Sequence, residues 1–341
     1  MIVLSENKFR EQLFPFTYSR HTVDIRIGIL TLREKWELLT GEIISTDETS
    51  PGIQIPANII PTAENFESII KFGIKNEDEE ETDPVKIIRH PWDIFLLNDF
   101  ALRNDFDLMT KNRVTQPISG TNQTINPQNI FIEDGAEVEC SILNAAAGPI
   151  YIGKNAVIME GSMIRGPFSL GENSSVKMGS KIYGATTIGP NCVAGGEIKN
   201  SVLFGNSNKA HDGYLGDSVL GEWCNLGAGT SNSNVKNTGG AVSYYFEKGG
   251  ASVIAGNKAG LLMGDYSRAA INTSFNTGTV VGVCCNIFGE KIPEKFTENF
   301  TWGNERYIFE KALKDIQAWK QMKGQSVSEY ETAMLKKLYY G

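Results

Sequence analysis

Aliphatic residues recur at every sixth position through the middle of the chain. The longest series has seven members in succession: Ile152, Ile158, Ile164, Leu170, Val176, Ile182 and Ile188. Neither an α-helix nor an ordinary β-strand has a period of six. That period is typical of a solenoid of short strands, with three strands per turn of a triangular prism and one inward aliphatic side chain per strand. The pattern resembles that of a left-handed parallel β-helix, a known exception to the right-handed crossover rule.

The same period returns in two later series. They are Tyr214, Leu220 and Leu226, and then Met263, Ala269, Phe275, Val281 and Ile287. We therefore expect these side chains, Tyr214 included, to face the interior of the prism. The offset of two positions between Ile188 and Tyr214 predicts an insertion, a bulge or a loop. The blurred pattern between Leu226 and Met263 predicts a loop that projects from the prism.

Glycine is concentrated in this region, where 25 of the 35 glycines lie between residues 150 and 290. Small residues are needed at the corners of a prism, where the backbone turns sharply and side chains would collide. The small residues 227–229 are therefore expected to form a corner between two faces.

The flanking segments have a different character. We expect a mainly β protein with a small α/β domain over residues 1–115, a linker over 116–130, the β-helix over 131–295 and a helical extension over 296–341. Residues 26–41 predict a strand-like start and then an amphipathic helix that ends at Gly41. Ser328 and Glu331 predict the capping box of a C-terminal helix.

Charge, cysteine content and hydropathy argue against several classes of protein. The net charge is −8, and six of the seven residues 77–83 are acidic, which predicts a solvated loop and argues against a nucleic-acid partner. None of the five cysteines forms a CxxC pair, so neither a zinc site nor a disulfide framework is indicated. No signal peptide opens the chain, and no apolar run approaches the about 20 residues that span a bilayer. We expect a cytoplasmic protein without a membrane partner.

Three segments carry a resemblance to a known family. They are EIK at 197–199, KAHDGYLGD at 209–217 and NLGAGTSNSN at 225–234. Together with the hexads they resemble the acyltransferase half of the bifunctional UDP-N-acetylglucosamine pyrophosphorylase/glucosamine-1-phosphate N-acetyltransferase. The resemblance implies a homotrimer that uses acetyl-CoA and takes His211 as its general base. A sugar ammonium must lose a proton before its nitrogen attacks a thioester, and an imidazole titrates near neutral pH.

The resemblance also implies ligand contacts. Contacts to the sugar phosphate are expected from Lys199, Tyr214, Asn225 and Asn234, and contacts to acetyl-CoA from Ala228, Gly264 and Val283. Tyr183 stands where the family has an arginine for the phosphate, and Arg165 or Lys181 are candidates to replace it. A backbone N–H in the 227–229 corner is the candidate donor to the oxyanion. The ordinary interpretations stay open: a structural His211, turn or ladder asparagines and a surface lysine.

The N-terminal region resembles sugar nucleotidyltransferases, but less closely than the hexad region resembles the acyltransferases. Residues 13–36 resemble the stretch that follows the nucleotide-binding loop, whereas the family's glycine-rich LxxGxGTR signature is absent. We therefore expect N-acetyl transfer to an amino sugar-1-phosphate or amino-sugar nucleotide. The first alternative is sugar-1-phosphate nucleotidyl transfer of the uridylyl or thymidylyl type, which would need Mg²⁺ and has Arg20, Asp24 and Arg26 as polar candidates. The second is a non-catalytic trimeric scaffold.

Overall fold

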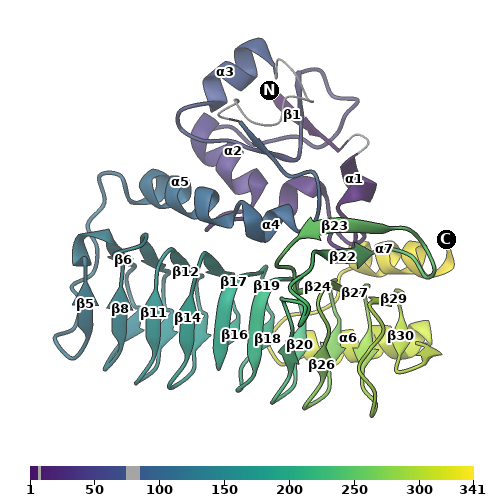
Figure 1. Ribbon diagram of the computed structural model, residues 1–341. Coiled ribbons are helices and arrows are strands. Elements are labelled where there is room, and N and C mark those ends of the chain that lie inside the picture. Colours follow the sequence, from purple (N-terminus) through teal and green to yellow (C-terminus); the bar gives the residue numbers. More distant parts are fainter. Residues whose placement is uncertain (7–8, 74–84) are drawn as a thin grey trace.

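The structure is a computed structural model that describes residues 1–6, 9–73 and 85–341. The acidic run at 77–83 lies outside the described residues. Short parallel strands stack in register along one axis, and Figure 1 shows them running the length of the molecule. The left-handed parallel β-helix expected from the hexads is confirmed.

The β-helix has three faces. Face 1 consists of β6 (Ile130–Ile132), β9 (Ile150–Ile152), β12 (Phe168–Leu170), β15 (Thr186–Ile188), the second halves of β17 (Glu197–Leu203) and β19 (Tyr214–Leu220), β24 (Leu261–Met263), β27 (Thr279–Val281) and β29 (Phe296–Thr297). Face 2 consists of β7 (Glu137–Val138), β10 (Val157–Ile158), β13 (Ser175–Val176), β16 (Val193–Ala194), β18 (Asn208–Lys209), β20 (Asn225–Leu226), β25 (Arg268–Ala269), β28 (Asn286–Ile287) and β30 (Thr301–Trp302), which turns back as β31 (Glu305–Arg306). Face 3 consists of β5 (Gln123–Ile125), β8 (Ile142–Asn144), β11 (Met163–Arg165), β14 (Lys181–Tyr183), the first halves of β17 and β19, β21 (Ser231–Asn232) and β26 (Ser274–Phe275). Parallel strands thus extend beyond the range 131–295 on both sides.

The aliphatic residues at every sixth position form the core of the β-helix. All seven aliphatics from Ile152 to Ile188 are at most 1% exposed and belong to one buried cluster. Ile158 pairs with Val176, so one regular turn of the prism takes three hexads. Stacked turns bury these side chains against one another, which is what stabilises a solenoid.

Tyr214 does not face the interior, contrary to the expectation. Leu215 occupies the buried position, while the Tyr214 side chain lies on the surface of face 3. The offset arises from short turns rather than from an insertion. Thr187 pairs with Val202, and Val202 pairs with Val219, so both turns are shorter than three hexads. The first turn has 15 residues and the second has 17, compared with 18 in a regular turn, so four residues are missing in total. In a repeat of six, a loss of four residues gives the same register as a gain of two.

The N-terminal region packs on face 1. It contains β1 (Ile2–Ser5), α1 (Phe9–Gln12), η1 (Thr22–Asp24), α2 (Leu32–Thr40), β2 (Ile53–Pro56), β3 (Ile59–Ile60), α3 (Phe66–Phe72) and β4 (Lys86–Ile87), and it continues into α4 (Asp93–Leu96) and α5 (Asn98–Thr110). Figure 1 shows α4 and α5 along the β-helix. Helix α2 has a Thr31–Glu34 capping box and ends at Gly41, which confirms the expected helix. A short turn, η2 (Pro127–Asn129), joins β5 to β6.

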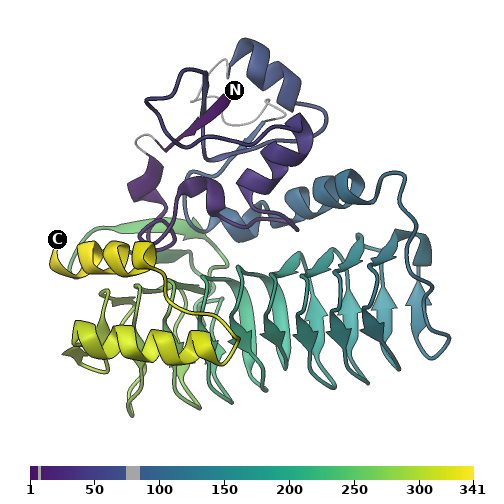
Figure 2. The same cartoon turned by 180° about the vertical axis from the view of Figure 1, so that it is seen from behind.

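The C-terminal helices cover part of face 2. Helix α6 (Phe309–Gln321) runs along the side of the prism, and α7 (Glu329–Tyr340) lies between it and the N-terminal region (Figure 2). The Ser328–Glu331 capping box is confirmed. The projecting loop contains the hairpin β22 (Val242–Tyr245) and β23 (Ser252–Gly256), whose Tyr244 stacks on Trp92. No helix in the described residues is long and apolar enough to cross a membrane.

Candidate functional site

Polar side chains gather on face 3 where β11, β14, β17 and β19 lie side by side. The register places Tyr183 beside Lys199, and Lys199 beside Gly216. Arg165 follows Ile164, which pairs with Ile182, so Arg165 continues the same column on the next strand. Three of the expected site residues, Arg165, Tyr183 and Lys199, therefore come together through strand register alone.

Tyr183 is fixed in this column by a carboxylate. Its hydroxyl donates to Glu197 Oε1 at 2.6 Å, and the Lys199 ammonium lies 6.0 Å from the centre of its ring. The hydrogen bond to Glu197, together with burial, raises the pKa of Tyr183 to about 12. The tyrosine is therefore neutral at physiological pH and is held as a donor to Glu197. Lys199 makes no such bond within the described residues, and its ammonium is available to an anion.

Tyr214 folds back over a glycine on the same strand. A Cβ atom on Gly216 would lie 2.5 Å from Tyr214 Cζ, so only glycine leaves room for the ring. Asn234 Nδ2 donates to the Tyr214 hydroxyl at 3.1 Å. Burial, with smaller contributions from nearby acidic groups, raises the pKa of Tyr214 to about 12. The ring thus forms a fixed wall of the site.

Asp217 holds this wall in place, and sequence reasoning did not single it out. Its side chain is buried and accepts from Asn200 Nδ2 at 2.7 Å and from Asn234 Nδ2. Asn200 and Asp217 both have positive φ, 46° and 47°, at successive corners of the prism. The sequence contained a hint of this role, because Asp217 is the last residue of the segment 209–217 that carries the family resemblance. Only the fold shows that Asp217 accepts hydrogen bonds from both Asn200 and Asn234.

His211 lies at the corner between face 2 and face 3, and its side chain is exposed. Its carbonyl accepts from Lys209 Nζ at 2.5 Å. Lys209 also donates to Gly195 O at 3.1 Å and occupies an inward position that is aliphatic in other turns. Burial lowers the pKa of Lys209 to about 8. The corner that carries His211 is therefore held from inside the prism.

The next corner along the axis adjoins His211. Gly229 N–H donates to Asp212 O at 3.0 Å, which joins the 227–229 corner to the His211 corner. Gly227 N–H is used in the ladder, whereas the Ala228 N–H donates to no acceptor in the described part of the chain. Ala228 therefore offers the free backbone donor among these three residues.

The remaining expected site residues lie elsewhere. Asn225 is on face 2 beneath α6, beside Asn208 and Arg268. Gly264 is buried, and a Cβ there would meet Pro15 of the N-terminal region. Val283 is fully buried in the cluster that packs against α6 and α7. None of the three faces the Lys199–Tyr214 surface within this chain.

The candidates for nucleotidyl transfer are all engaged in structural contacts. Arg20 is mostly buried, with 9% of its side chain exposed, and pairs with Asp265 and with Glu222 on the β-helix. Asp24 Oδ1 accepts from Arg33 Nε at 2.7 Å.

Arg26 is engaged as well, because its guanidinium donates to Ile29 O and pairs with Glu34 at 3.3 Å. In the described residues, no group of three or more His, Cys, Asp and Glu side chains is arranged to hold a metal ion.

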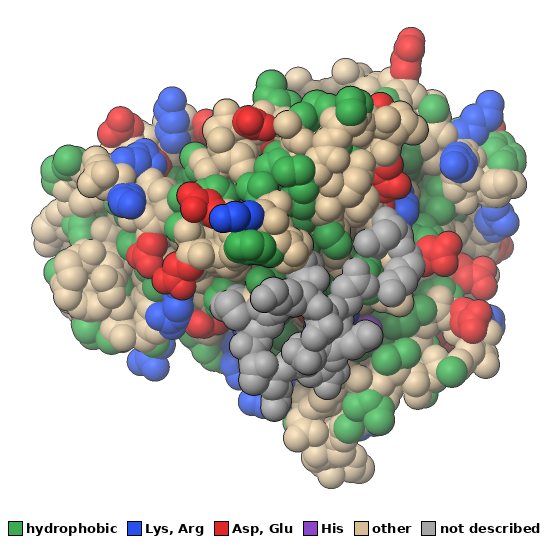
Figure 3. All heavy atoms as spheres, turned by 90° about the horizontal axis from the view of Figure 1, so that it is seen from above, with side chains coloured by type: hydrophobic (Ala, Val, Ile, Leu, Met, Phe, Trp, Pro, Cys, Tyr) green, Lys and Arg blue, Asp and Glu red, His purple; other side chains and the backbone are tan. Residues whose placement is uncertain are grey.

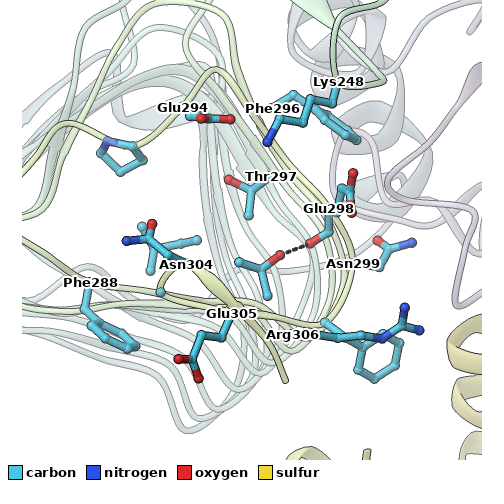
Figure 4. Close-up of a pocket in the computed structure, with 15 residues that line it drawn as sticks. Lys248, Phe288, Glu294, Phe296, Thr297, Glu298, Asn299, Asn304, Glu305 and Arg306 are labelled. Carbon is cyan, nitrogen blue, oxygen red and sulfur yellow. Dashed lines mark hydrogen bonds between the residues drawn. The ribbon is translucent and has the colours of Figure 1, made fainter. Parts of the chain in front are cut away.

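One cavity lies away from these residues. It measures about 460 Å³ and opens at the C-terminal end of the β-helix, where Lys248, Glu298 and Arg306 are among its lining residues (Figure 4). On the face that carries the N-terminal region, acidic and basic side chains are interspersed rather than gathered in one patch (Figure 3). This cavity also has polar lining residues, but none of the site residues expected from the sequence is among them.

Comparison with known proteins agrees with this picture. A family described as sugar nucleotidyl transferase matches residues 2–51. The protein named bifunctional protein GlmU of Methanococcus vannielii is 28% identical over 240 residues, which cover 66% of this chain and 48% of the relative. The protein of the same name from Methanococcus maripaludis (strain DSM 14266) is 34% identical over 203 residues, covering 57% of this chain and 41% of the relative.

A further relative, named bifunctional sugar-1-phosphate nucleotidylyltransferase/acetyltransferase, comes from Sulfurisphaera tokodaii. It is 32% identical over 93 residues, which cover 27% of this chain and 23% of the relative. The chain thus matches less than half of the length of each of these relatives. The resemblance inferred from the sequence is confirmed.

Proposed function

We propose that this protein transfers an acetyl group from acetyl-CoA to the amino group of an amino sugar phosphate or amino-sugar nucleotide. The observation that carries the proposal is the face 3 column. An available lysine, a tyrosine wall and Asn234 converge there, and His211 stands on the adjoining corner. The similarity to bifunctional acetyltransferases supports the same reaction class.

In this proposal the sugar rests against Tyr214 and its phosphate meets Lys199. A lysine is a strong point charge for a phosphate group. Arg165 is exposed on the same column and supplies the second positive charge that the family's arginine would provide. Asn234 is held by Asp217 and orients the Tyr214 hydroxyl toward the ligand.

The proposed chemistry uses His211 as the general base. Its imidazole accepts the proton that the sugar ammonium loses, and the amine then attacks the thioester carbonyl of acetyl-CoA. The negative charge that develops on the carbonyl oxygen is stabilised by the free N–H of Ala228. Collapse of the tetrahedral intermediate expels the CoA thiolate, which takes up the second proton that the nitrogen loses, and leaves the neutral acetamide of the sugar and free CoA thiol.

The direct test is a thiol-release assay with acetyl-CoA and a panel of amino sugar-1-phosphates. His211→Ala should lower the rate about 10²- to 10⁴-fold, because general-base catalysis contributes that much. His90→Ala is the control, since His90 stacks on Trp92 and belongs to none of the strands of face 3. Normal turnover by a folded His211→Ala variant would refute the role of His211. The absence of thiol release for every sugar would favour the scaffold alternative.

Nucleotidyl transfer stays the second candidate, because the matched family at residues 2–51 is a sugar nucleotidyl transferase. The ion pairs of Arg20, Asp24 and Arg26 argue against it. We expect no pyrophosphate release from a nucleoside triphosphate and a sugar-1-phosphate. Rapid Mg²⁺-dependent pyrophosphate release would promote this candidate above N-acetyl transfer.

A further inference from the structure

A second cavity lies between face 2 and the C-terminal helix α6. Its volume is about 380 Å³, which is within the range of small-molecule pockets. Its lining residues include the polar Asn225, Arg268, Asn286 and Asp315 and the aromatic Phe288, Trp302 and Trp319. Strands β20, β25 and β28 form its floor and α6 forms its wall, so one chain builds it entirely.

Arg268 is the unusual group in this cavity. It is 7% exposed, and its Nε and Nη2 atoms are both buried with no hydrogen-bond acceptor in the described part of the chain. These two nitrogens form one edge of the guanidinium, the edge that binds two oxygen atoms side by side. Charged donors are rarely left unpaired in a folded interior, because burial without a partner costs free energy.

The surrounding residues do not supply the missing acceptor. The Arg268 guanidinium lies 4.8 Å from the centre of the Trp319 ring, which covers it. Asp315 is the acidic residue of the cavity, but its Oδ2 accepts the hydroxyl of Tyr307 and it makes no ion pair with Arg268. Burial lowers the pKa of Arg268 from its usual value, and an arginine is nonetheless charged at neutral pH.

A neighbouring cavity adjoins this one and has more basic than acidic lining residues. It measures about 360 Å³ and shares Trp302 and Asp315 with the first. Its charged lining residues are the basic Arg306, Lys311 and Lys314 and the acidic Glu305 and Asp315. An anion that approaches along α6 therefore passes two lysines before it reaches the buried guanidinium.

We propose that the cavity between β25 and α6 binds a small molecule that carries a phosphate or a carboxylate. The oxyanion pairs with the Nε–Nη2 edge of Arg268, and a flat part of the molecule packs against Trp302. Asn225 and Asn286 flank Arg268 on the neighbouring strands and supply amides for the remaining oxygens. Trp319 moves aside to admit the anion. This site is separate from the Lys199–Tyr214 surface and does not depend on the proposed acetyl transfer.

The test measures thermal stability and tryptophan fluorescence with inorganic phosphate and, in a second arm, with malonate. A ligand that binds only the folded protein raises its melting temperature with concentration. We expect the wild type to be stabilised by at least one of the two anions, and the arm that responds identifies the oxyanion. Arg268→Gln should weaken that response about 10- to 100-fold, and Arg268→Lys should restore part of it, because it keeps the charge but not the fork.

Lys199→Gln is the matched control for anion binding at face 3 and should retain the response. Arg268→Gln should also be no less stable than the wild type without anions, since it removes an unpaired buried charge. The proposal is wrong if neither anion stabilises the wild type, or if the response survives in Arg268→Gln. It is also wrong if the response is lost in Lys199→Gln alone, which would place the anion on face 3.

Discussion

Gly216 is the position where a single methyl group should disable the face 3 site without unfolding the chain. The Tyr214 ring crosses this residue, and a Cβ there would lie 2.5 Å from Tyr214 Cζ and 2.6 Å from Tyr214 Cε1. Real Cβ contacts do not come within 3.0 Å, so the ring must swing away in Gly216→Ala. The obstacle is the end of a partly exposed side chain rather than backbone, and so the strand itself can stay in place.

The size of the effect follows from what the displaced ring loses. The hydrogen bond from Asn234 is broken, which lowers the free energy of unfolding by about 1 kcal/mol. Loss of the tyrosine wall weakens acceptor binding more, and we expect KM for the amino sugar to rise about 10-fold. The phenolic pKa of Tyr214, about 12 in the wild type, should fall toward the ordinary value of 10 as the ring becomes solvated.

Three measurements check this reasoning: thermal unfolding, acceptor KM by thiol release, and a spectrophotometric tyrosine titration. Gly120→Ala is the matched control, because Gly120 has open space where a Cβ would go. Tyr214→Phe should reproduce the loss of the hydrogen bond while it keeps the ring in place. Wild-type KM and an unchanged titration in Gly216→Ala would refute the account of Tyr214.

Two further predictions concern assembly and pH. Light scattering should give about three times 37.5 kDa, because the family resemblance implies a homotrimer; a strict monomer would contradict this prediction. Glu6→Gln should lower the melting temperature at pH 7 but have little effect near pH 2. Burial opposes ionisation of Glu6, but His21, the Thr22 N–H and Arg10 outweigh it and lower its pKa to about 2. The stabilisation is therefore present above 4.5 and is lost as the pH falls through about 2, and an equal effect at both pH values would contradict this.

The core of the β-helix was predictable because each strand contributes one inward side chain and the spacing is constant. The prediction was wrong at Tyr214. Two turns before it are shorter than three hexads, so counting in steps of six places Tyr214, rather than the adjacent Leu215, in the core. Sequence period reports register only while every turn has the same length. Leu215 is the core residue. Because Tyr214 and Leu215 are both apolar and adjacent, the sequence does not distinguish which of them is buried.

The site was predictable only in part, for a different physical reason. The resemblance pointed to Lys199, Tyr214 and Asn234, which lie on one surface: neighbouring strands carry Lys199 and Tyr214, and Asn234 donates to the Tyr214 hydroxyl. It also pointed to Asn225, which the prism turns onto another face. A linear motif does not record which face a residue occupies. The unpaired guanidinium of Arg268 is invisible in the sequence, since its significance lies in acceptors that the described part of the fold does not provide.

The three faces of the β-helix are covered to different extents by the rest of the chain. The N-terminal region lies on face 1, and α6 lies on part of face 2. Face 3 stays open along β5, β8 and β11, where Ile125, Ile142 and Met163 are exposed by 51%, 39% and 43%. Apolar side chains aligned on an open face favour contact with another protein surface. The same face carries the Lys199–Tyr214 column, so a second copy packed against β8 and β11 would lie on the same side of the prism as the proposed site, in keeping with the homotrimer that the resemblance implies.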